Sequence, residues 1–195
     1  MEFISRVQNL FYHCFSYLYF FNLVNFLSLL FLTTYTTIIV SLVWARFKFF
    51  RIESKSSELG SRLYDPIVVI QIITTIYFSL NIDFQTFVSK WIGCALYIVG
   101  VSLFLWAITT AKHLNFAFSD NVDSLVTTGP YGIIRHPIYF SYIIIWFSST
   151  LVFNSLILWI TLIYLVAFYI LSARKEEEVI LNSEYSGEYR EYRKK

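Results

Sequence analysis

The side chains best suited to chemistry are gathered in residues 125–139, which read LVTTGPYGIIRHPIY. Two helix breakers, Gly129-Pro130 and His136-Pro137, stand seven residues apart there, because proline lacks a backbone N–H and disfavours helix in the preceding residue. The stretch between them is predicted to hold at most about two helical turns, with Pro137 in the first turn of the next helix. The side chains that this arrangement would fix at the mouth of an apolar segment are Tyr131, Arg135, His136 and Tyr139. The simpler alternative is an ordinary helix N-terminus whose arginine contacts lipid headgroups.

The C-terminal residues 173–195, ARKEEEVILNSEYSGEYREYRKK, form a second stretch of polar side chains. They are predicted to form a helix that emerges from the last apolar segment. Glu177 and Glu178 follow Arg174 by three and four residues, so one helical turn would bring these charges together. The side chains expected on one face of this helix are Leu181, Tyr185, Tyr189 and Tyr192. The simpler alternative is a solvated, salt-bridged helix end.

The composition indicates which elements must position these groups. Of the 195 residues, 57% are hydrophobic and 14% are charged, whereas a soluble domain has roughly 25% charged residues. The hydrophobic residues stand in several long runs with few charges. Such runs predict an all-α fold, a multi-pass transmembrane helical bundle. Residues 3–20, rich in Phe and Tyr, are expected to form an N-terminal helix that either spans the membrane or lies flat on it. The five expected spans are residues 24–45, 67–82, 91–111, 138–153 and 156–171.

The last two apolar runs are separated only by Asn154-Ser155, and neither contains a charge, which predicts a tight helical hairpin. Both polar stretches flank this hairpin at one end, so they are expected to lie close together. Their aromatic, cationic and anionic groups would form a small-molecule site at the membrane surface. The chain thus divides into an N-terminal transmembrane region, residues 1–111, and a C-terminal region around the hairpin that carries this expected site, residues 112–195.

The distribution of charge predicts the orientation of the chain in the membrane. Of the 15 lysines and arginines, only Arg6 and Lys90 lie outside the segments assigned to the cytoplasm, which places the C-terminus on the cytoplasmic side. Cys14 and Cys94 both lie in apolar runs, with neither a disulfide framework nor metal-ligand spacing. Neither a metal nor a nucleic-acid partner is expected.

Residues 125–139, followed some forty residues later by the pattern EExxLxxxYxxxYxxY, resemble the isoprenylcysteine carboxyl methyltransferase family and its relatives, the phospholipid methyltransferases. The resemblance covers about residues 112–192 and is only topological in the first hundred residues. It implies an enzyme of the membrane bilayer that transfers a methyl group from S-adenosylmethionine to a lipid-like substrate at the cytoplasmic membrane face. It also implies a fold other than the Rossmann fold, and the sequence contains no GxGxxG motif.

Matched residue by residue, the resemblance implies a set of cofactor contacts. These are the backbone of Ser124, Leu125 and Val126, together with Tyr131, His136, Pro137, Ile138, Tyr139 and Glu177. A carboxylate can bind ribose hydroxyls or an ammonium group by charge-assisted hydrogen bonds, and aromatic ring faces attract a sulfonium cation. Arg174 and Glu178 are the expected catalytic residues.

One departure from the family pattern concerns the arginine that orients the acceptor. The family usually places it four residues before the first glutamate of the pattern, where this chain has Ala173, and Arg174 follows one residue later. One residue turns a side chain by about 100° around a helix. Arg174 is still expected to reach the acceptor, with Arg135 as its substitute.

The acceptor expected from this arrangement is a carboxylate such as that of isoprenylcysteine, which needs an orienting arginine and no general base. A phospholipid amine is the alternative acceptor, and its proton would have to leave to a group such as Glu178. Two other interpretations stay open. One is an NADPH-dependent membrane reductase of the sterol-reductase type, whose C-terminal motifs are distantly similar, and the other is a non-catalytic membrane protein that retains the fold.

Overall fold

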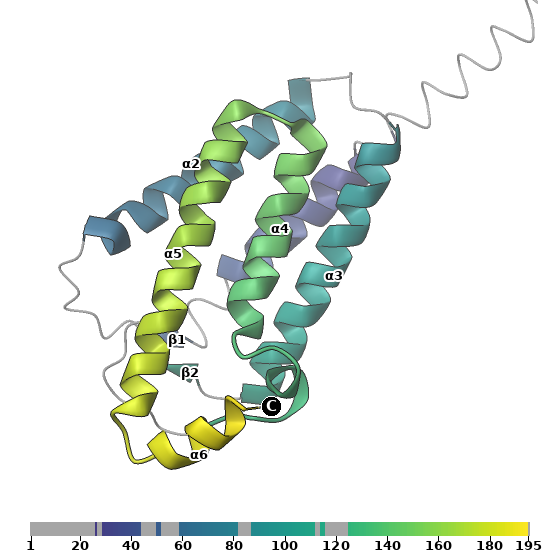
Figure 1. The fold of residues 1–195 in the computed structure, drawn as a ribbon. Helices are drawn as coiled ribbons and strands as arrows, with labels where there is room; N and C mark the ends of the chain where they lie inside the picture. The colour runs from purple at the N-terminus through teal and green to yellow at the C-terminus, as the bar shows by residue number, and fades with distance from the viewer. Residues whose placement is uncertain are drawn as a thin grey trace, which may run out of the picture.

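The computed structural model describes residues 26, 29–43, 50–51, 59–81, 87–111, 114–115 and 125–194. Within these residues the fold is almost entirely helical (Figure 1). The predicted N-terminal helix of residues 3–20 lies outside them. The helices are Leu29–Val43, α2 (Leu59–Asn81), α3 (Phe87–Ala111), α4 (Pro137–Phe153), α5 (Leu156–Leu181) and the short α6 (Ser186–Tyr192). A single 3₁₀ turn, η1, spans Gly129–Gly132, and the two-residue strand β1 (Phe50–Arg51) pairs in parallel with β2 (Leu114–Asn115).

Three helices, α2, α3 and α5, are long and apolar enough to cross a membrane. The helix Leu29–Val43 and α4 are apolar but shorter, so the expectation of five spans stays a prediction. α2 begins at Leu59, which is earlier than the predicted apolar run, and it holds Pro66 in its interior. The residues just before the predicted span 67–82 are therefore helical too, because a proline inside a helix removes one hydrogen bond and bends the axis without having to end it.

α3 and α4 pack closely, and two glycines of α3 lie at their interface. A Cβ atom on Gly93 would lie 2.3 Å from Cγ2 of Val152, and one on Gly100 would lie 2.7 Å from Cγ1 of Ile145. The hydroxyl of Ser148 donates a hydrogen bond of 2.8 Å to the carbonyl oxygen of Gly93. The small residues thus let the two backbones approach, as is common between membrane helices.

The predicted hairpin of α4 and α5 is confirmed, with its joint at Asn154-Ser155. Asn154 adopts the left-handed conformation (φ 44°, ψ 39°), which asparagine tolerates better than most residues. Its N–H donates to the carbonyl oxygen of Thr150 at 2.8 Å, and its side-chain oxygen accepts from the indole N–H of Trp159 at 2.9 Å. The joint therefore reverses the chain within two residues.

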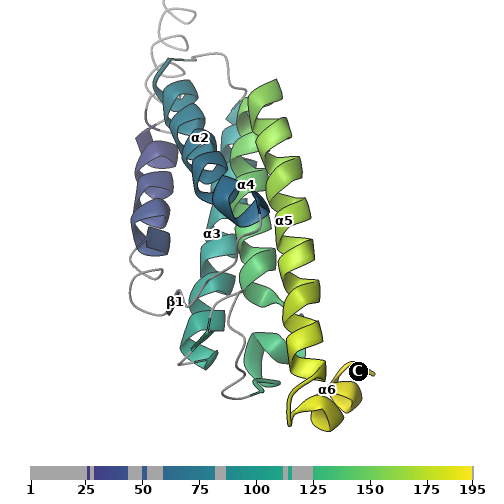
Figure 2. The same cartoon turned by 90° about the vertical axis from the view of Figure 1, so that its left-hand side faces the viewer.

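α2 crosses the hairpin obliquely (Figure 2) and is joined to it through a buried amide. Nε2 of Gln71 lies 3.1 Å from Oγ of Ser149 and 3.3 Å from both the carbonyl oxygen of Trp146 and Oγ1 of Thr150. The hydroxyl of Thr161 donates to Oε1 of Gln71. This amide joins three helices, because it has partners on both α4 and α5.

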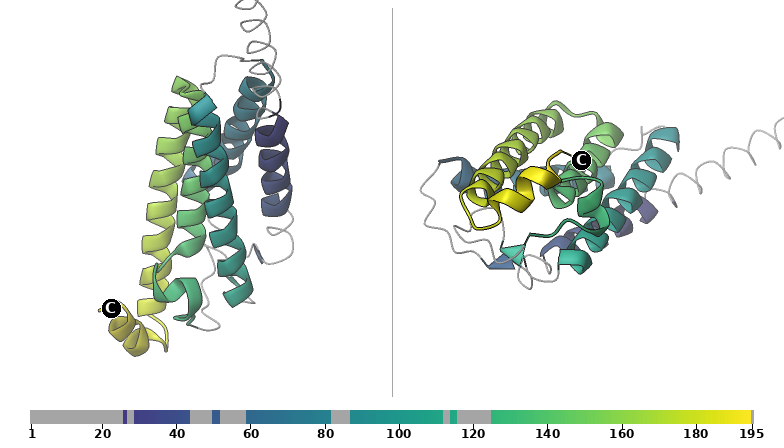
Figure 3. Two further views of the ribbon diagram at one scale, coloured as in Figure 1. Left: turned by 90° about the vertical axis from the view of Figure 1, so that its right-hand side faces the viewer. Right: turned by 60° about the horizontal axis from the view of Figure 1, so that its bottom comes forward.

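The prediction of one continuous helix after the last apolar run is wrong beyond Leu181. α5 continues without a break through the charged residues to Leu181, and the chain then turns before α6. The hydroxyl of Ser183 donates to the carbonyl oxygen of Ile180 at 2.8 Å and accepts from the N–H of Tyr185 at 3.2 Å. A serine side chain that binds nearby backbone competes with helix in this way. α6 consequently lies at the same end of the bundle as η1 (Figures 1 and 3).

Candidate functional site

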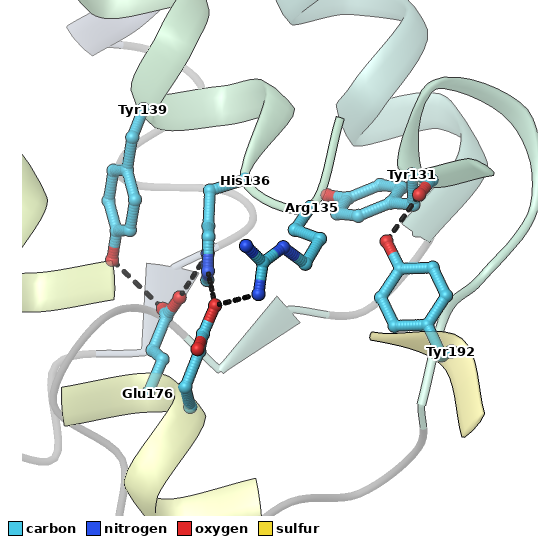
Figure 4. A network of polar contacts seen from close by, with 7 residues as sticks. Tyr131, Arg135, His136, Tyr139, Glu176 and Tyr192 are labelled. Carbon is cyan, nitrogen blue, oxygen red and sulfur yellow. Dashed lines mark hydrogen bonds and ion pairs between the residues drawn. The ribbon is translucent and has the colours of Figure 1, made fainter. Parts of the chain in front are cut away.

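The candidate site lies where three segments meet: the turn from η1 into α4, the charged end of α5, and α6 (Figure 4). Gly129 opens the turn with a positive φ of 60°, and a Cβ atom on it would lie only 2.9 Å from Oγ1 of Thr110, at the end of α3. A glycine is required there because only it combines this backbone conformation with so close a neighbour. Pro130 lies in the first turn of η1, and Pro137 occupies the first turn of α4, as the sequence predicted.

His136 immediately precedes α4 and lies between two carboxylates of α5. Its Nδ1 atom is 3.3 Å from Oε2 of Glu176, and its Nε2 atom is 3.2 Å from Oε1 of Glu177. A neutral imidazole donates from one nitrogen only, whereas the protonated ring donates from both. Burial opposes the charged ring, but the hydrogen bonds and negative charges of the two glutamates outweigh it and raise the pKa of His136 above its ordinary value of 6.5.

Arg135 shares the same carboxylate oxygen. Its Nη1 atom lies 3.0 Å from Oε1 of Glu177, and its side chain is 46% exposed against 18% for the glutamate. The charged end of α5 lies beyond its apolar run, and there burial opposes ionisation of Glu177. The hydrogen bond from His136 and the charge of Arg135 outweigh this burial and hold the pKa of Glu177 below its ordinary value of 4.5. Glu177 is therefore ionised at neutral pH, and its Oε1 atom faces both Arg135 and His136.

Tyr139 is one turn into α4 and reaches the other glutamate. Its hydroxyl donates to Oε1 of Glu176 at 2.9 Å. The ring is buried and stacks on His136 and on Tyr169, with ring centroids 5.9 Å and 5.6 Å apart. These contacts continue the polar cluster into the aromatic core between α4 and α5.

α6 closes the cluster from the other side. The hydroxyl of Tyr192 donates to the carbonyl oxygen of Tyr131 in η1, and Tyr189 is buried beneath it. The hydroxyls of Tyr131 and Tyr189 are both buried and have no hydrogen-bond partner of ordinary geometry in the described part of the chain. Burial raises the pKa of both phenols, so both hydroxyls are neutral, and the charge of the neighbouring Glu177 raises the pKa of Tyr189 further.

The structure brings four of the predicted cofactor residues together, namely Tyr131, His136, Tyr139 and Glu177. Pro137 and Ile138 are buried in the first turn of α4 beside them. Leu125 and Val126 are half-buried in the segment that leads into η1, whereas Ser124 lies outside the described residues.

Arg174 and Glu178, the predicted catalytic pair, are not part of this cluster. Both are exposed, and neither makes an ion pair with another described residue. They lie on the exposed face of α5, the face that carries Ile163, Ile170 and Leu171 earlier in the helix.

Glu176 was missed as a site residue, because the motif comparison selected the two glutamates that follow it. A signal was available along α5, where five of the six buried side chains recur at alternating steps of four and three residues. They are Leu158, Leu162, Leu165, Tyr169 and Ser172, and the sixth is Thr161. The next step falls on Glu176, so the same periodicity predicts that this carboxylate faces the neighbouring helix.

The donor set suits S-adenosylmethionine better than a metal. The buried, unpartnered hydroxyl of Tyr131, the ring faces and the carboxylates match a ligand that carries both a cation and hydroxyl groups. Among the described residues, no group of three or more His, Cys, Asp or Glu side chains is arranged to hold a metal ion.

Comparison with known proteins gives one match. The family model described as phospholipid methyltransferase matches residues 88–188, which is more than half of the chain. The match includes almost all of α3, the hairpin of α4 and α5, and the cluster around His136 except Tyr189 and Tyr192 of α6. No curated protein and no solved structure matches the chain.

Proposed function

Because the chain belongs to the phospholipid methyltransferase family, we propose that it transfers a methyl group from S-adenosylmethionine to a lipidic acceptor at the cytoplasmic face of a membrane. One observation carries this proposal: His136 and Glu177, from the two halves of the motif, contact each other at the end of an apolar hairpin. Direct contact between the two halves supports their acting as one binding site.

The residues of the cluster would hold the cofactor, and when bound it supplies a methyl group attached to a sulfonium centre. Glu177 would accept hydrogen bonds from ribose hydroxyls or from the ammonium group. The rings of Tyr131 and Tyr139 offer faces to a cation, and the buried Tyr131 hydroxyl can donate to a further polar group. Pro137 and Ile138 would hold the backbone of the first turn of α4 in place beside the bound cofactor.

The acceptor that the cluster supports best is the amine of a phospholipid. Its cationic headgroup would be attracted by carboxylates, and Arg135, the arginine of the cluster, is already paired with Glu177. A carboxylate acceptor, the one favoured by the sequence, needs a guanidinium that can turn toward it. Arg174 offers one at the exposed end of α5, so this acceptor is the second candidate.

The family and the three candidate spans indicate an integral membrane protein. We further infer five spans and a cytoplasmic C-terminus. Two arguments support this topology: the helix Leu29–Val43 and α4 are also apolar, and lysines and arginines are concentrated on one side of the predicted spans. A reporter fused after Lys195 should be accessible only from the cytoplasm, and an external signal would overturn the orientation.

The cofactor assignment is tested by titrating the purified full-length protein calorimetrically with S-adenosylhomocysteine and, separately, with NADPH. Binding of S-adenosylhomocysteine alone is the expected result. Binding of NADPH alone would replace the proposal with a reductase, and binding of neither would favour a non-catalytic membrane protein.

The acceptor is tested by following radiolabelled methyl transfer to vesicles of phosphatidylethanolamine and to a prenylcysteine acid. With an amine acceptor, Glu178→Gln is expected to lose turnover on the aminolipid while Arg174→Ala retains it. Loss of turnover on the acid in Arg174→Ala, with unchanged affinity for S-adenosylhomocysteine, would instead establish the carboxylate acceptor.

A further inference from the structure

We propose that Glu176 is a positioning residue for methyl transfer, which holds His136 and Tyr139 in the orientations in which they meet the cofactor. The role rests on the proposed function, and it adds a residue that the family resemblance did not assign.

The geometry places each oxygen of Glu176 on a different partner. Oε1 accepts from the hydroxyl of Tyr139 at 2.9 Å, and Oε2 lies 3.3 Å from Nδ1 of His136. Both partners belong to the start of α4, whereas Glu176 belongs to the end of α5. This one carboxylate therefore fixes two side chains of the motif across a helix interface.

The contact with His136 also decides where the imidazole carries its protons. An ionised carboxylate accepts hydrogen bonds only, so Oε2 of Glu176 requires a proton on Nδ1. Nε2 in turn faces Oε1 of Glu177 at 3.2 Å. The charged and titratable groups around the ring are the two glutamates of α5, Arg135 from the preceding turn, Tyr139 from α4 and Tyr189 from α6.

Glu176 differs from Glu177 in how many of its carboxylate oxygens are contacted by residues 135–139. In Glu177 the contacts of Arg135 and His136 both involve Oε1, and neither involves Oε2. In Glu176 both oxygens are engaged by the start of α4. Its effect on the reaction is therefore indirect and passes through His136 and Tyr139.

The test compares full-length wild type, Glu176→Gln and, as a matched control, Glu184→Gln, whose carboxylate is exposed in the turn before α6. Affinity for S-adenosylhomocysteine is measured by calorimetry between about pH 5 and pH 9, the range in which histidine titrates. Glu176→Gln is expected to bind roughly tenfold or more weakly, since a hydrogen bond to a charged group is lost. Its pH inflection should move to lower pH, because His136 loses a carboxylate that favours its proton.

A second measurement does not depend on the cofactor. The titration of the His136 ring is followed by NMR in the free protein, with its signal assigned by its loss in His136→Asn. Its midpoint should fall in Glu176→Gln and stay unchanged in Glu184→Gln. Tyr139→Phe removes only the other hydrogen bond of Glu176, so it should weaken binding while leaving the inflection in place.

The outcomes separate this proposal from the one on which it rests. If wild type binds S-adenosylhomocysteine but Glu176→Gln matches Glu184→Gln in affinity and in the His136 midpoint, Glu176 has no positioning role. If wild type does not bind S-adenosylhomocysteine, the proposed function itself fails. A lower His136 midpoint without any change in affinity would likewise overturn the positioning role, since the ring would then be coupled to Glu176 without serving the ligand.

Discussion

The Nε2 atom of His136 lies 3.2 Å from Oε1 of Glu177, across 41 residues of sequence. The contact joins the last residue before α4 to the charged end of α5, so both helices of the hairpin are held at the end where they leave the apolar region. Arg135 approaches the same oxygen at 3.0 Å, which makes Glu177 the point at which the two polar stretches of the sequence meet.

Replacing Glu177 by Gln should weaken binding of S-adenosylhomocysteine by about 1.5–3 kcal/mol, the contribution of a hydrogen bond to a charged group. The amide keeps the size of the side chain and removes its charge. A loss of affinity would therefore show that the negative charge of Glu177 contributes to cofactor binding. Calorimetry measures the effect, with Glu184→Gln as the control because that carboxylate is exposed and away from the cluster. Unchanged affinity in Glu177→Gln would remove this residue from the cofactor site.

The stability of the protein should depend on pH through the same two residues. The glutamates raise the pKa of His136 above 6.5 despite its burial, so its contribution is complete below that pH and is lost as the pH rises through the higher folded value. Hydrogen bonding and the charge of Arg135 lower the pKa of Glu177 below 4.5 despite burial, so its contribution is present above that pH and is lost as the pH falls through the lower folded value.

These two contributions together place the highest unfolding temperature between about pH 4.5 and pH 6.5. Thermal unfolding in detergent at several pH values measures the dependence. In His136→Asn the fall of stability on the alkaline side should become shallower, and an unchanged slope in that variant would contradict the assignment of the fall to His136.

Gly129→Ala should destabilise the protein and distort the turn before α4. Its φ of 60° costs a residue with a side chain about 1–2 kcal/mol, and a Cβ atom would also crowd Thr110 at 2.9 Å. Gly187→Ala is the matched control, because a Cβ atom there meets nothing within 4 Å. Denaturant or thermal unfolding compares the two variants, and equal stabilities would mean that the turn relaxes without cost.

Replacing the buried amide of Gln71 should lower stability moderately. Gln71→Leu is expected to lose about 2 kcal/mol, because the amide makes about three hydrogen bonds to α4 and α5, and hydrogen bonds between membrane helices contribute roughly 0.6 kcal/mol each. The hydroxyls of Ser149, Thr150 and Thr161 also bind carbonyl oxygens of their own helices, so they retain partners. Gln71→Ala should lose more, since it leaves a cavity as well. Reversible unfolding in mixed detergent measures both, and equal losses would show that the site collapses around the smaller residue.

Features governed by local chemistry could be predicted from the sequence. The joint at Asn154-Ser155 followed from two polar residues between uncharged runs, and small residues such as Gly93 and Gly100 allow α4 to approach closely. The contact of His136 with Glu177 followed from placing both at the same end of one hairpin. Each of these depends on sequence spacing or on the size of a side chain.

Features that depend on how a helix is rotated could not be predicted from the motifs alone. Glu176, Glu177 and Glu178 are consecutive, and the packing of α5 decides which of them turn toward α4. The break after Leu181 depends on Ser183, whose hydroxyl binds the backbone although nothing in the spacing of the tyrosines indicates a stop. Arg174 is exposed for the same reason that Glu178 is, since four residues bring a side chain back to the same face.

The joint of three helices at Gln71 has a consequence for the order in which the chain is assembled during synthesis. All its hydrogen-bond partners come from residues 146–161, which leave the ribosome after α2 is complete. An amide without partners in hydrocarbon costs several kcal/mol. α2 is therefore expected to stay beside the insertion machinery or the headgroup layer until the hairpin arrives, and these helices enter the bilayer as one unit.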